Sequence, residues 1–309
     1  MKKIGISVCI ATCDRPLLLE RLLNSIASQN LAYDCPGFEI IVVDNGADRE
    51  AEKVVRKFER ANADMLVTYD IQPQKNISLT RNLALSHAKG DYIAFIDDDE
   101  YASKNWLSEL YLALTTTKGD AVFGPVLPVY PPGTPDWIIE SRVFESYNPK
   151  DHQQISIGRT GNALMRSEWI KEKKFTFNPE LGITGGEDTD FFNRMIEKNG
   201  FLYWAKKAVV YEEIENSRLN IWWIIKRAFR YGQTYSEHKT RNLGVAYKVL
   251  YFLLRFAVFG IILLSTIPLS LFFGFSHGVK SFRYAFLQLG HASVAFPFRY
   301  EEYKRRSSV

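Results

Sequence analysis

Residues 92–100 read YIAFIDDDE and are the most informative segment for the architecture of this chain. A short apolar run, 92–96, has the length of a buried strand, and four acidic residues follow it directly. Carboxylates this close repel one another, so their position at the end of a buried strand requires a compensating cation. Mg²⁺ and Mn²⁺ suit such a place, because they take oxygen ligands from one or two carboxylates and from substrate phosphates. A solvated acidic turn is the alternative, and the rest of the chain has to decide.

Short apolar runs alternate with helical patterns around this stretch. We expect strands at residues 4–11, 39–43, 65–70 and 92–96, and helices at residues 16–29, 51–62 and 78–88. Pro16 in the first turn of one helix and Ser78 as the N-cap of another are the boundary signals. Strands that alternate with helices of this length predict an α/β fold with a doubly wound, mostly parallel, Rossmann-like sheet.

The second half of the chain is organised differently. Five prolines in residues 125–135 predict a loop, and a helix is expected at residues 189–198. Near residue 218 the pattern changes to a basic, Trp-rich amphipathic helix. We therefore divide the chain into an α/β domain, 1–217, and a helical region, 218–309, for which we expect membrane association.

Residues 249–275 of that region are strongly apolar apart from Arg255 and are long enough to span a bilayer with tilt. Pro268 should break or kink this segment. Because residues 282–298 are also apolar, a single span and a re-entrant or interfacial hairpin both stay open. A buried core helix is the third alternative.

Composition narrows the class of protein. The chain has 309 residues, of which 46% are hydrophobic and 24% charged, as in a folded protein. The net charge of +4 is concentrated in the C-terminal third, which indicates a membrane surface or a polyphosphate as partner. Nucleic acid is not expected, since no nucleic-acid motif accompanies the charge. The basic residues are Lys226, Arg227, Arg230, Lys239, Arg241, Lys248, Arg255, Arg299, Lys304, Arg305 and Arg306.

Cysteine usage and the N-terminus bear on localisation. The three cysteines form neither zinc knuckles nor a disulfide framework, which favours a reducing compartment. The N-terminal segment lacks the long apolar core of a signal peptide. We therefore expect domain 1–217 in the cytoplasm, at the inner face of the cell membrane.

Polar side chains gather where the predicted strands end, which is where open α/β sheets bind ligands. Arg81 adds a guanidinium at the start of helix 78–88. Several carboxylates, one arginine and a helix N-terminus suit a nucleoside diphosphate. Taken singly, each residue has an ordinary alternative as an N-cap, a turn residue or a surface ion pair. The residues at the strand ends are Thr12, Asp14, Arg15, Asp44, Asp97, Asp98 and Asp99.

Four segments together resemble family 2 glycosyltransferases of the GT-A fold. They are residues 7–16 (SVCIATCDRP), 41–45 (IVVDN), 80–82 (TRN) and 95–100 (FIDDDE), in that family's order and spacing. The resemblance covers roughly residues 4–215.

This resemblance implies a nucleotide-diphosphate sugar as donor and Mg²⁺ or Mn²⁺ as cofactor. It assigns Asp44 to the nucleotide base, Arg81 to the donor site, and Asp97 and Asp99 to the DxD motif. Asp99 is the better candidate for the metal ligand. The division between ribose and metal among Asp97, Asp98 and Asp99 stays open.

A second acidic centre, residues 185–190 (GGEDTD), resembles the ED motif of the same family. The resemblance makes Asp188 the catalytic base of an inverting enzyme, and Glu187 a residue that orients acceptor or donor sugar. The residues agree with this role, because two glycines allow close backbone approach and a helix N-terminus stabilises a carboxylate. A capping aspartate in an acidic first turn is the alternative.

Other segments match less closely. Residues 161–166 resemble the family's strand beneath the sugar, where Asn162 could touch donor or acceptor. Many members carry a metal-binding His near residues 210–213; here Glu212 or Glu213 could replace it, or the metal lacks that ligand. An Arg of residues 218–232 could cover the diphosphate, unless that helix serves the membrane surface.

The sequence thus predicts a metal-dependent inverting glycosyltransferase with a lipid-linked or glycan acceptor in cell-surface glycan synthesis. One alternative is a sugar-phosphate nucleotidyltransferase, although residues 12–16 lack the glycine-rich loop usual there. Another is a non-catalytic, membrane-anchored sugar-binding protein.

Overall fold

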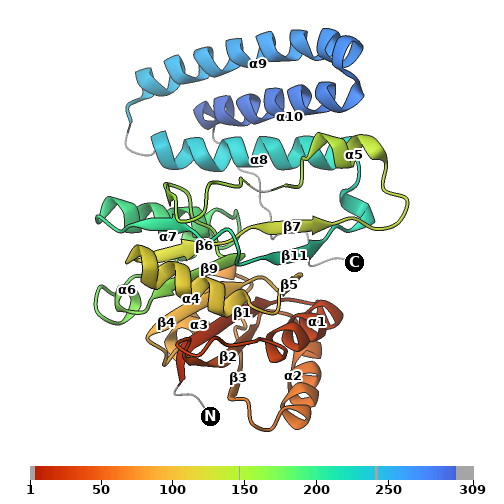
Figure 1. The fold of residues 1–309 in the computed structure, drawn as a ribbon. Helices are drawn as coiled ribbons and strands as arrows, with labels where there is room; N and C mark the ends of the chain where they lie inside the picture. Colours follow the sequence, from red (N-terminus) through yellow and green to blue (C-terminus); the bar gives the residue numbers. More distant parts are fainter. Residues whose placement is uncertain (1–3, 146, 241–242, 297–309) are drawn as a thin grey trace. The chain divides into compact units, whose positions relative to one another are not determined.

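The computed structural model describes residues 4–145, 147–240 and 243–296 (Figure 1). These residues form two compact units. The first contains 4–128 and 147–212, and the second contains 129–145 and 213–296. The expected boundary between 217 and 218 stays a prediction. The basic residues Arg241, Arg299, Lys304, Arg305 and Arg306, and the end of the apolar stretch 282–298, lie outside the described residues.

The first unit is built on a mixed sheet in the order β3-β2-β1-β4-β9-β6-β10-β8. β1 pairs in parallel with β2 and β4, and β2 with β3, whereas β9 is antiparallel to β4 and β6. The four strands expected in the N-terminal half are confirmed. The bounds are β1 (Ile4–Thr12), β2 (Gly37–Asp44), β3 (Val67–Ile71), β4 (Tyr92–Ile96), β6 (Ala121–Phe123), β8 (Gln154–Ile155), β9 (Asn162–Arg166) and β10 (Leu202–Trp204).

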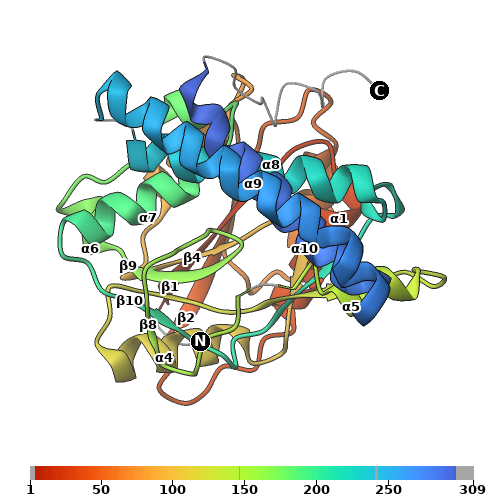
Figure 2. The ribbon, with the colours of Figure 1, turned by 90° about the horizontal axis from the view of Figure 1, so that it is seen from above.

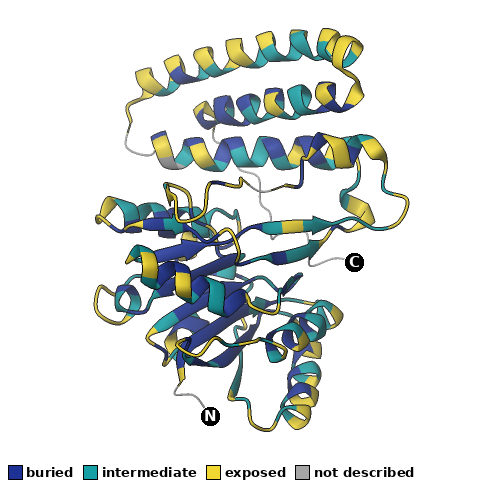
Figure 3. Cartoon of the chain, in the orientation of Figure 1, coloured by how far each residue is buried: buried dark blue, intermediate teal, exposed yellow. Residues whose placement is uncertain are grey.

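Helices cover both faces of this sheet, as a doubly wound fold requires. α1, α2 and α4 pack on the face that includes Val8 and Ile10, and α3, α6 and α7 pack on the face that includes Cys9. Both faces are therefore buried, and the central strands are dark blue in Figure 3. The bounds are α1 (Pro16–Ala27), α2 (Glu50–Ala61), α3 (Ile77–His87), α4 (Trp106–Thr117), α6 (Glu168–Lys171) and α7 (Glu187–Glu197), with the short 3₁₀ helix η1 (Pro179–Leu181).

The start of α3 differs from the expectation. Asn76 is its N-cap, with Oδ1 accepting a hydrogen bond from the Leu79 N–H at 3.0 Å. Ser78, the expected cap, lies inside the helix, and its buried hydroxyl has no partner among the described residues. The prediction was wrong because an asparagine two residues earlier has the extended backbone that an N-cap needs.

The expected loop at 125–135 also proved partly wrong. It contains β7 (Val126–Val129), an edge strand of a small sheet with the order β5-β11-β7. An edge position tolerates proline, because one side of the strand makes no ladder bonds. The other strands are β5 (Glu100–Ala102) and β11 (Val210–Glu213).

The second unit is helical. Ile138 of α5, Ile224 of α8 and Val279 of α10 belong to one apolar core. α10 lies between α8 and α9 in Figure 1, and Figure 2 shows α9 lying along α10. The bounds are α5 (Asp136–Ser141), α8 (Ile221–Thr240), α9 (Val245–Phe273) and α10 (Phe275–Ala292), with the short 3₁₀ helices η2 (Asn216–Arg218) and η3 (Ser293–Ala295).

α9 runs without interruption through Pro268, so the expected break does not occur. Gly274, with a φ of 93° that favours glycine, turns the chain from α9 into α10. Among the described helices, α9 is long and apolar enough to cross a membrane, with a mean hydropathy of 2.3.

Candidate active site

Arg81, the fifth residue of α3, joins the two acidic centres of the sequence. Its side chain is 8% exposed, and Nη2 donates to Asp97 Oδ1 at 3.1 Å. Nη1 forms an ion pair with Oε1 of Glu187, the first residue of α7. The run after β4 and the ED segment, far apart in the chain, therefore belong to one site.

Arg15 and Thr12 hold the other two aspartates of the run. Arg15 Nη1 donates to Asp98 Oδ1 at 2.8 Å and to Asp99 Oδ2 at 2.9 Å. Thr12 Oγ1 donates to the second oxygen of Asp98 at 2.9 Å. Asp98 is 6% exposed, whereas the side chains of Asp97 and Asp99 are 42% and 17% exposed. Asp98 thus supports the turn, and Asp97 and Asp99 are the more accessible carboxylates.

The charges around Asp97 are only partly balanced. The pKa of Asp97 is raised to about 6: desolvation is the largest cause, Arg81 opposes the rise, and the carboxylates of Asp99, Asp98 and Asp188 add to it. Because 42% of the side chain is exposed, water relieves part of this rise. A cation bound here would relieve the repulsion that remains.

Glu100 closes the acidic turn, a role that the sequence did not reveal. Its Oε2 accepts from the Asp97 N–H at 3.1 Å, while its own N–H donates to the Asp97 carbonyl at 3.2 Å. Burial, aided by Asp97 and Asp99, raises the pKa of Glu100 well above its ordinary value. Glu212 pairs with Glu100 across β5 and β11, so this expected substitute for a metal-binding His lies beside the run.

Asp44 lies at the end of β2, beside Thr12 at the end of β1. It is 1% exposed, with Oδ1 accepting from the Gly46 N–H at 2.7 Å and Oδ2 from the Tyr69 hydroxyl at 3.0 Å. Burial raises the pKa of Tyr69, which keeps this hydroxyl a donor. Tyr69 was missed because its contact comes from the neighbouring strand, β3.

Asp14 occupies the more exposed side of the same corner. It has a φ of 55° and accepts a hydrogen bond from the Ala47 N–H at 3.3 Å. Gly46 lies between the two carboxylates: a Cβ there would come within 2.5 Å of Asp14 Oδ1 and 3.0 Å of Asp44 Oδ1. Glycine at this position therefore lets Asp14 and Asp44 face one corner.

Asp188 and Glu187 differ in environment although they are neighbours. Gly185 and Gly186 have φ values of 85° and 90° and lead into α7. Glu187 is 3% exposed; burial raises its pKa, and Arg81 opposes the rise. Asp188 is half-buried, and its Oδ1 accepts from the Thr189 N–H at 2.6 Å in the positive first turn of the helix. Glu187 is thus a buried pairing partner, and Asp188 is the more accessible carboxylate.

Asn162 is 3% exposed and makes three structural hydrogen bonds. Its amide nitrogen donates to the carbonyls of Pro125 at 3.0 Å and Ala208 at 2.7 Å, and its oxygen accepts from Trp106 Nε1 at 2.8 Å. These bonds consume both of its donor hydrogens and favour a structural role. Contact between Asn162 and a sugar stays a prediction.

Asn82 and Asn76 of the α3 region hold the segment that leads to Gly185. The Asn82 side chain donates to the Phe177 carbonyl and accepts from the Phe177 N–H, both at 2.8 Å. Asn76 Nδ2 donates to the Pro179 carbonyl at 2.9 Å. Asn82 stands in the TRN segment, but no pattern in the sequence indicated this contact.

The described residues contain no group of three or more His, Cys, Asp or Glu side chains that could hold a metal ion. Mg²⁺ and Mn²⁺ do not need such a group, because substrate phosphates and water complete their coordination. Asp97 and Asp99 could supply hard oxygen donors, and a cation beside Asp97 would offset the desolvation and the neighbouring carboxylates that raise its pKa. The residues therefore fit a divalent cation.

Comparison with known proteins identifies the family of this chain. The chain matches the family model described as glycosyl transferase family 2 over residues 7–173, and glycosyl transferase family group 2 over residues 92–298. The succinoglycan biosynthesis protein ExoM of Rhizobium meliloti is 36% identical over 80% of this chain and 79% of its own length. The glycosyltransferase AglE of Haloferax volcanii is 24% identical over 66% of this chain and 60% of its own.

Solved structures share the fold at low sequence identity. The mannosyltransferase PcManGT of Pyrobaculum calidifontis, in complex with GDP-Man and Mn²⁺, has a TM-score of 0.65 and 16% identity, over 94% of this chain and 87% of its own. Staphylococcus aureus TarS in complex with UDP-GlcNAc has a TM-score of 0.55 and 16% identity, over 94% and 91%. The fold, the motifs and the family match agree on the enzyme class. The chain belongs to glycosyl transferase family 2 and is a glycosyltransferase of the GT-A fold.

Proposed function

We propose that this enzyme transfers a sugar, with inversion, from a nucleotide-diphosphate donor to a hydroxyl of a lipid-linked or glycan acceptor in cell-surface polysaccharide synthesis. The relative ExoM is named for succinoglycan biosynthesis, which supports the product class. The structural neighbours carry GDP-Man or UDP-GlcNAc, which supports the donor class.

The observation that carries the proposal is the Arg81 bridge between Asp97 and Glu187. It brings the accessible carboxylates of the DxD run and Asp188 to the same sheet edge. Asp97 and Arg81 also border the same narrow, mostly buried crevice as Thr160. Donor diphosphate and acceptor hydroxyl can therefore meet at one place.

The donor would lie along the ends of β1, β2 and β4. Asp44, oriented by Tyr69, would accept hydrogen bonds from the base. Asp97 and Asp99 would hold Mg²⁺ or Mn²⁺, which supplies charge stabilisation for the diphosphate leaving group. Asp98 would keep this turn in place through Thr12 and Arg15.

Asp188 would act as the general base. It takes the proton of the acceptor hydroxyl, and the oxygen attacks the anomeric carbon as the bond to the diphosphate breaks. Because attack comes from the face opposite the leaving group, the configuration inverts. Glu187, buried against Arg81, holds the start of α7 and thereby the position of Asp188.

Membrane association rests on the second unit. α9 is 29 residues long and mostly apolar, with Lys248 and Arg255 as its charged residues, and α8 and α10 carry cations such as Lys226 and Lys280. This suits a lipid-linked acceptor at the cytoplasmic face of the cell membrane, where nucleotide sugars are available.

Asp188→Asn tests the mechanism, with Glu180→Gln, an exposed carboxylate of the same segment, as matched control. We expect Asp188→Asn to keep the affinity for the donor that titration calorimetry measures. Its rate of sugar transfer should fall at least about a hundredfold, since the substitution removes the base. The control should match the parent in both measurements. Turnover retained by Asp188→Asn would reject the base assignment, whereas lost donor binding would point to a role in the donor site.

A further inference from the structure

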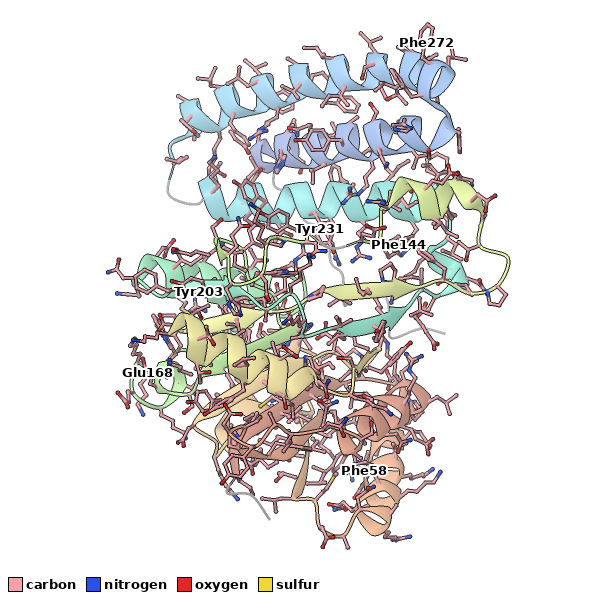
Figure 4. All side chains as sticks on the ribbon, viewed as in Figure 1. Phe58, Phe144, Glu168, Tyr203, Tyr231 and Phe272 are labelled. Carbon is pink, nitrogen blue, oxygen red and sulfur yellow. The ribbon has the colours of Figure 1, made fainter. Side chains whose placement is uncertain are left out.

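One side of α9 is exposed and apolar along its whole length. Leu253, Ile261, Leu264 and Leu271 are between 56% and 79% exposed, and the helix is yellow along this side in Figure 3. Phe272, labelled in Figure 4, is 80% exposed at the end near the turn. At 1.5 Å per residue, 29 residues give a strip about 44 Å long.

The opposite side of α9 packs on α10 and carries the polar groups. Arg255 Nη1 donates to Gln288 Oε1 at 2.9 Å. Further along, Ser265 Oγ lies 3.3 Å from Ser281 Oγ. Polar side chains are thus enclosed within the pair and apolar ones face outward, the reverse of a hairpin built for water.

α10 is bound on its other side by α8. A Cβ on Gly290 would collide with the Phe229 carbonyl, so the two backbones are in contact. Ser236 of α8 also joins all three helices, with its Oγ 2.7 Å from Nδ1 of His291 and 2.9 Å from the Tyr251 hydroxyl. The second unit is therefore a stack in which α9 is an outer layer.

We infer that α9 lies in the plane of the membrane as a one-sided anchor, its exposed face in the acyl chains and α10 and α8 on the water side. This inference deepens the proposed membrane association and rests on it. The occupant of the face is lipid hydrocarbon, flanked by anionic headgroups that meet Lys248 and Lys280.

Spanning arrangements conflict with the contacts of the stack. If α9 crossed the bilayer alone, Arg255 would lose Gln288 and enter hydrocarbon unpaired. If the whole stack crossed, the exposed cations Lys226 and Lys239 of α8 would have to cross as well. Each such charge is strongly disfavoured at the bilayer centre. The in-plane arrangement keeps every contact and exposes only apolar side chains to lipid.

Depth measurement separates the arrangements. Leu253→Cys, Leu264→Cys and Leu271→Cys are each labelled with an environment-sensitive fluorophore, and the full chain is bound to vesicles of equal phosphatidylethanolamine and phosphatidylglycerol. Lipids brominated at different chain positions then report depth. Leu112→Cys, on an exposed site of α4 in the first unit, is the matched control, and the parent chain gives the background from native cysteines.

We expect the three α9 labels to be quenched at one shallow depth, about 5–10 Å below the headgroups, and the control to stay unquenched. A helix across the bilayer would separate Leu253 and Leu271 by about 27 Å in depth, which would overturn the inference. A label depth that increases steadily from Leu253 to Leu271, towards the turn at Gly274, would indicate a re-entrant hairpin. That result would also overturn the inference.

Two further outcomes separate this inference from the proposed function. If the chain floats with vesicles but no α9 label is quenched, another surface binds the membrane, or a second copy covers α9, and the in-plane anchor is wrong. If the chain does not float at all yet transfers sugar to a soluble acceptor, membrane association itself fails while the glycosyltransferase assignment stands.

Discussion

At the scale of single residues, Arg81 is the centre of the charge balance. It pairs with Glu187, which is 3% exposed, and with Asp97, which is more accessible. The resemblance assigned Arg81 to the donor site, and the geometry adds that it fixes the acidic groups relative to one another. A guanidinium suits this place because its donors fork in one plane towards two carboxylates.

Removing Arg81 should be costly for stability. In Arg81→Ala, Glu187 keeps a buried carboxylate without a partner, so the free energy of unfolding should fall by about 3 kcal/mol. The double variant Arg81→Ala/Glu187→Gln should lose less than the sum of the two single variants, because residue 187 then carries no unpaired buried charge. Chemical denaturation in detergent measures all three.

The control for this cycle is Arg56→Ala. Arg56 pairs with Glu59 on the surface of α2, with a side chain 49% exposed, and such pairs contribute about 0–1 kcal/mol. Equal losses for the Arg81 and Arg56 variants would contradict a special role for the buried bridge.

The proposed role of Asp97 as a metal ligand predicts that donor binding depends on pH. Its raised pKa, about 6, means that it is ionised above that value and takes up a proton below it. A proton competes with a divalent cation, so Mn²⁺-dependent donor affinity should fall about tenfold between about pH 7 and about pH 5. Titration calorimetry at both pH values measures this donor affinity. Asp97→Asn should lose the Mn²⁺ dependence at both, and an affinity of the parent that does not change with pH would refute the assignment.

At the scale of elements, α3 organises the site through its N-terminal cap. Asn76 caps the helix and also donates to Pro179, whereas the hydroxyl of Ser78 is buried without a partner among the described residues. Asn76→Ala should therefore lower the free energy of unfolding by about 1–2 kcal/mol. Ser78→Ala should change it by less than about 0.5 kcal/mol. Thermal and chemical unfolding of the two variants measures both losses. A larger loss for Ser78→Ala than for Asn76→Ala would identify Ser78 as the cap.

At the scale of the whole molecule, our proposal assigns donor binding to the first compact unit and membrane binding to the second. The double variant Leu253→Glu/Leu264→Glu puts two charges on the exposed face of α9 and should abolish vesicle flotation. Donor affinity should stay unchanged, because the donor residues belong to the first unit. The rate of transfer to a lipid-linked acceptor should fall about a hundredfold, because enzyme and acceptor are then no longer bound to the same membrane surface.

Leu112→Glu, which puts a charge at an exposed position of α4, serves as control and should leave flotation and transfer intact. If the double variant still transferred to the lipid-linked acceptor at the parental rate, membrane binding through α9 would have no part in the reaction.

Much of the fold follows from local patterns. The apolar runs of β1, β2 and β4 and the helical spacing of α1 and α2 are visible in short windows, because burial acts on each strand or helix face separately. The cap of α3 and strand β7 were misjudged, since Asn76 and Ser78 are both acceptable caps, and an edge strand tolerates the prolines that usually indicate a loop.

The family, the α/β architecture and the candidate carboxylates could be predicted from the sequence, because each motif at a strand end lies within a few consecutive residues. Three contacts became visible only in the folded chain: Arg81 joins Asp97 to Glu187, Glu100 closes the acidic turn, and the Asn162 side chain is occupied by structural hydrogen bonds. These contacts join residues from separate strands and helices, so no window of sequence contains both partners. The same reason applies to α9: its composition indicates lipid, but which side faces lipid depends on its packing against α10.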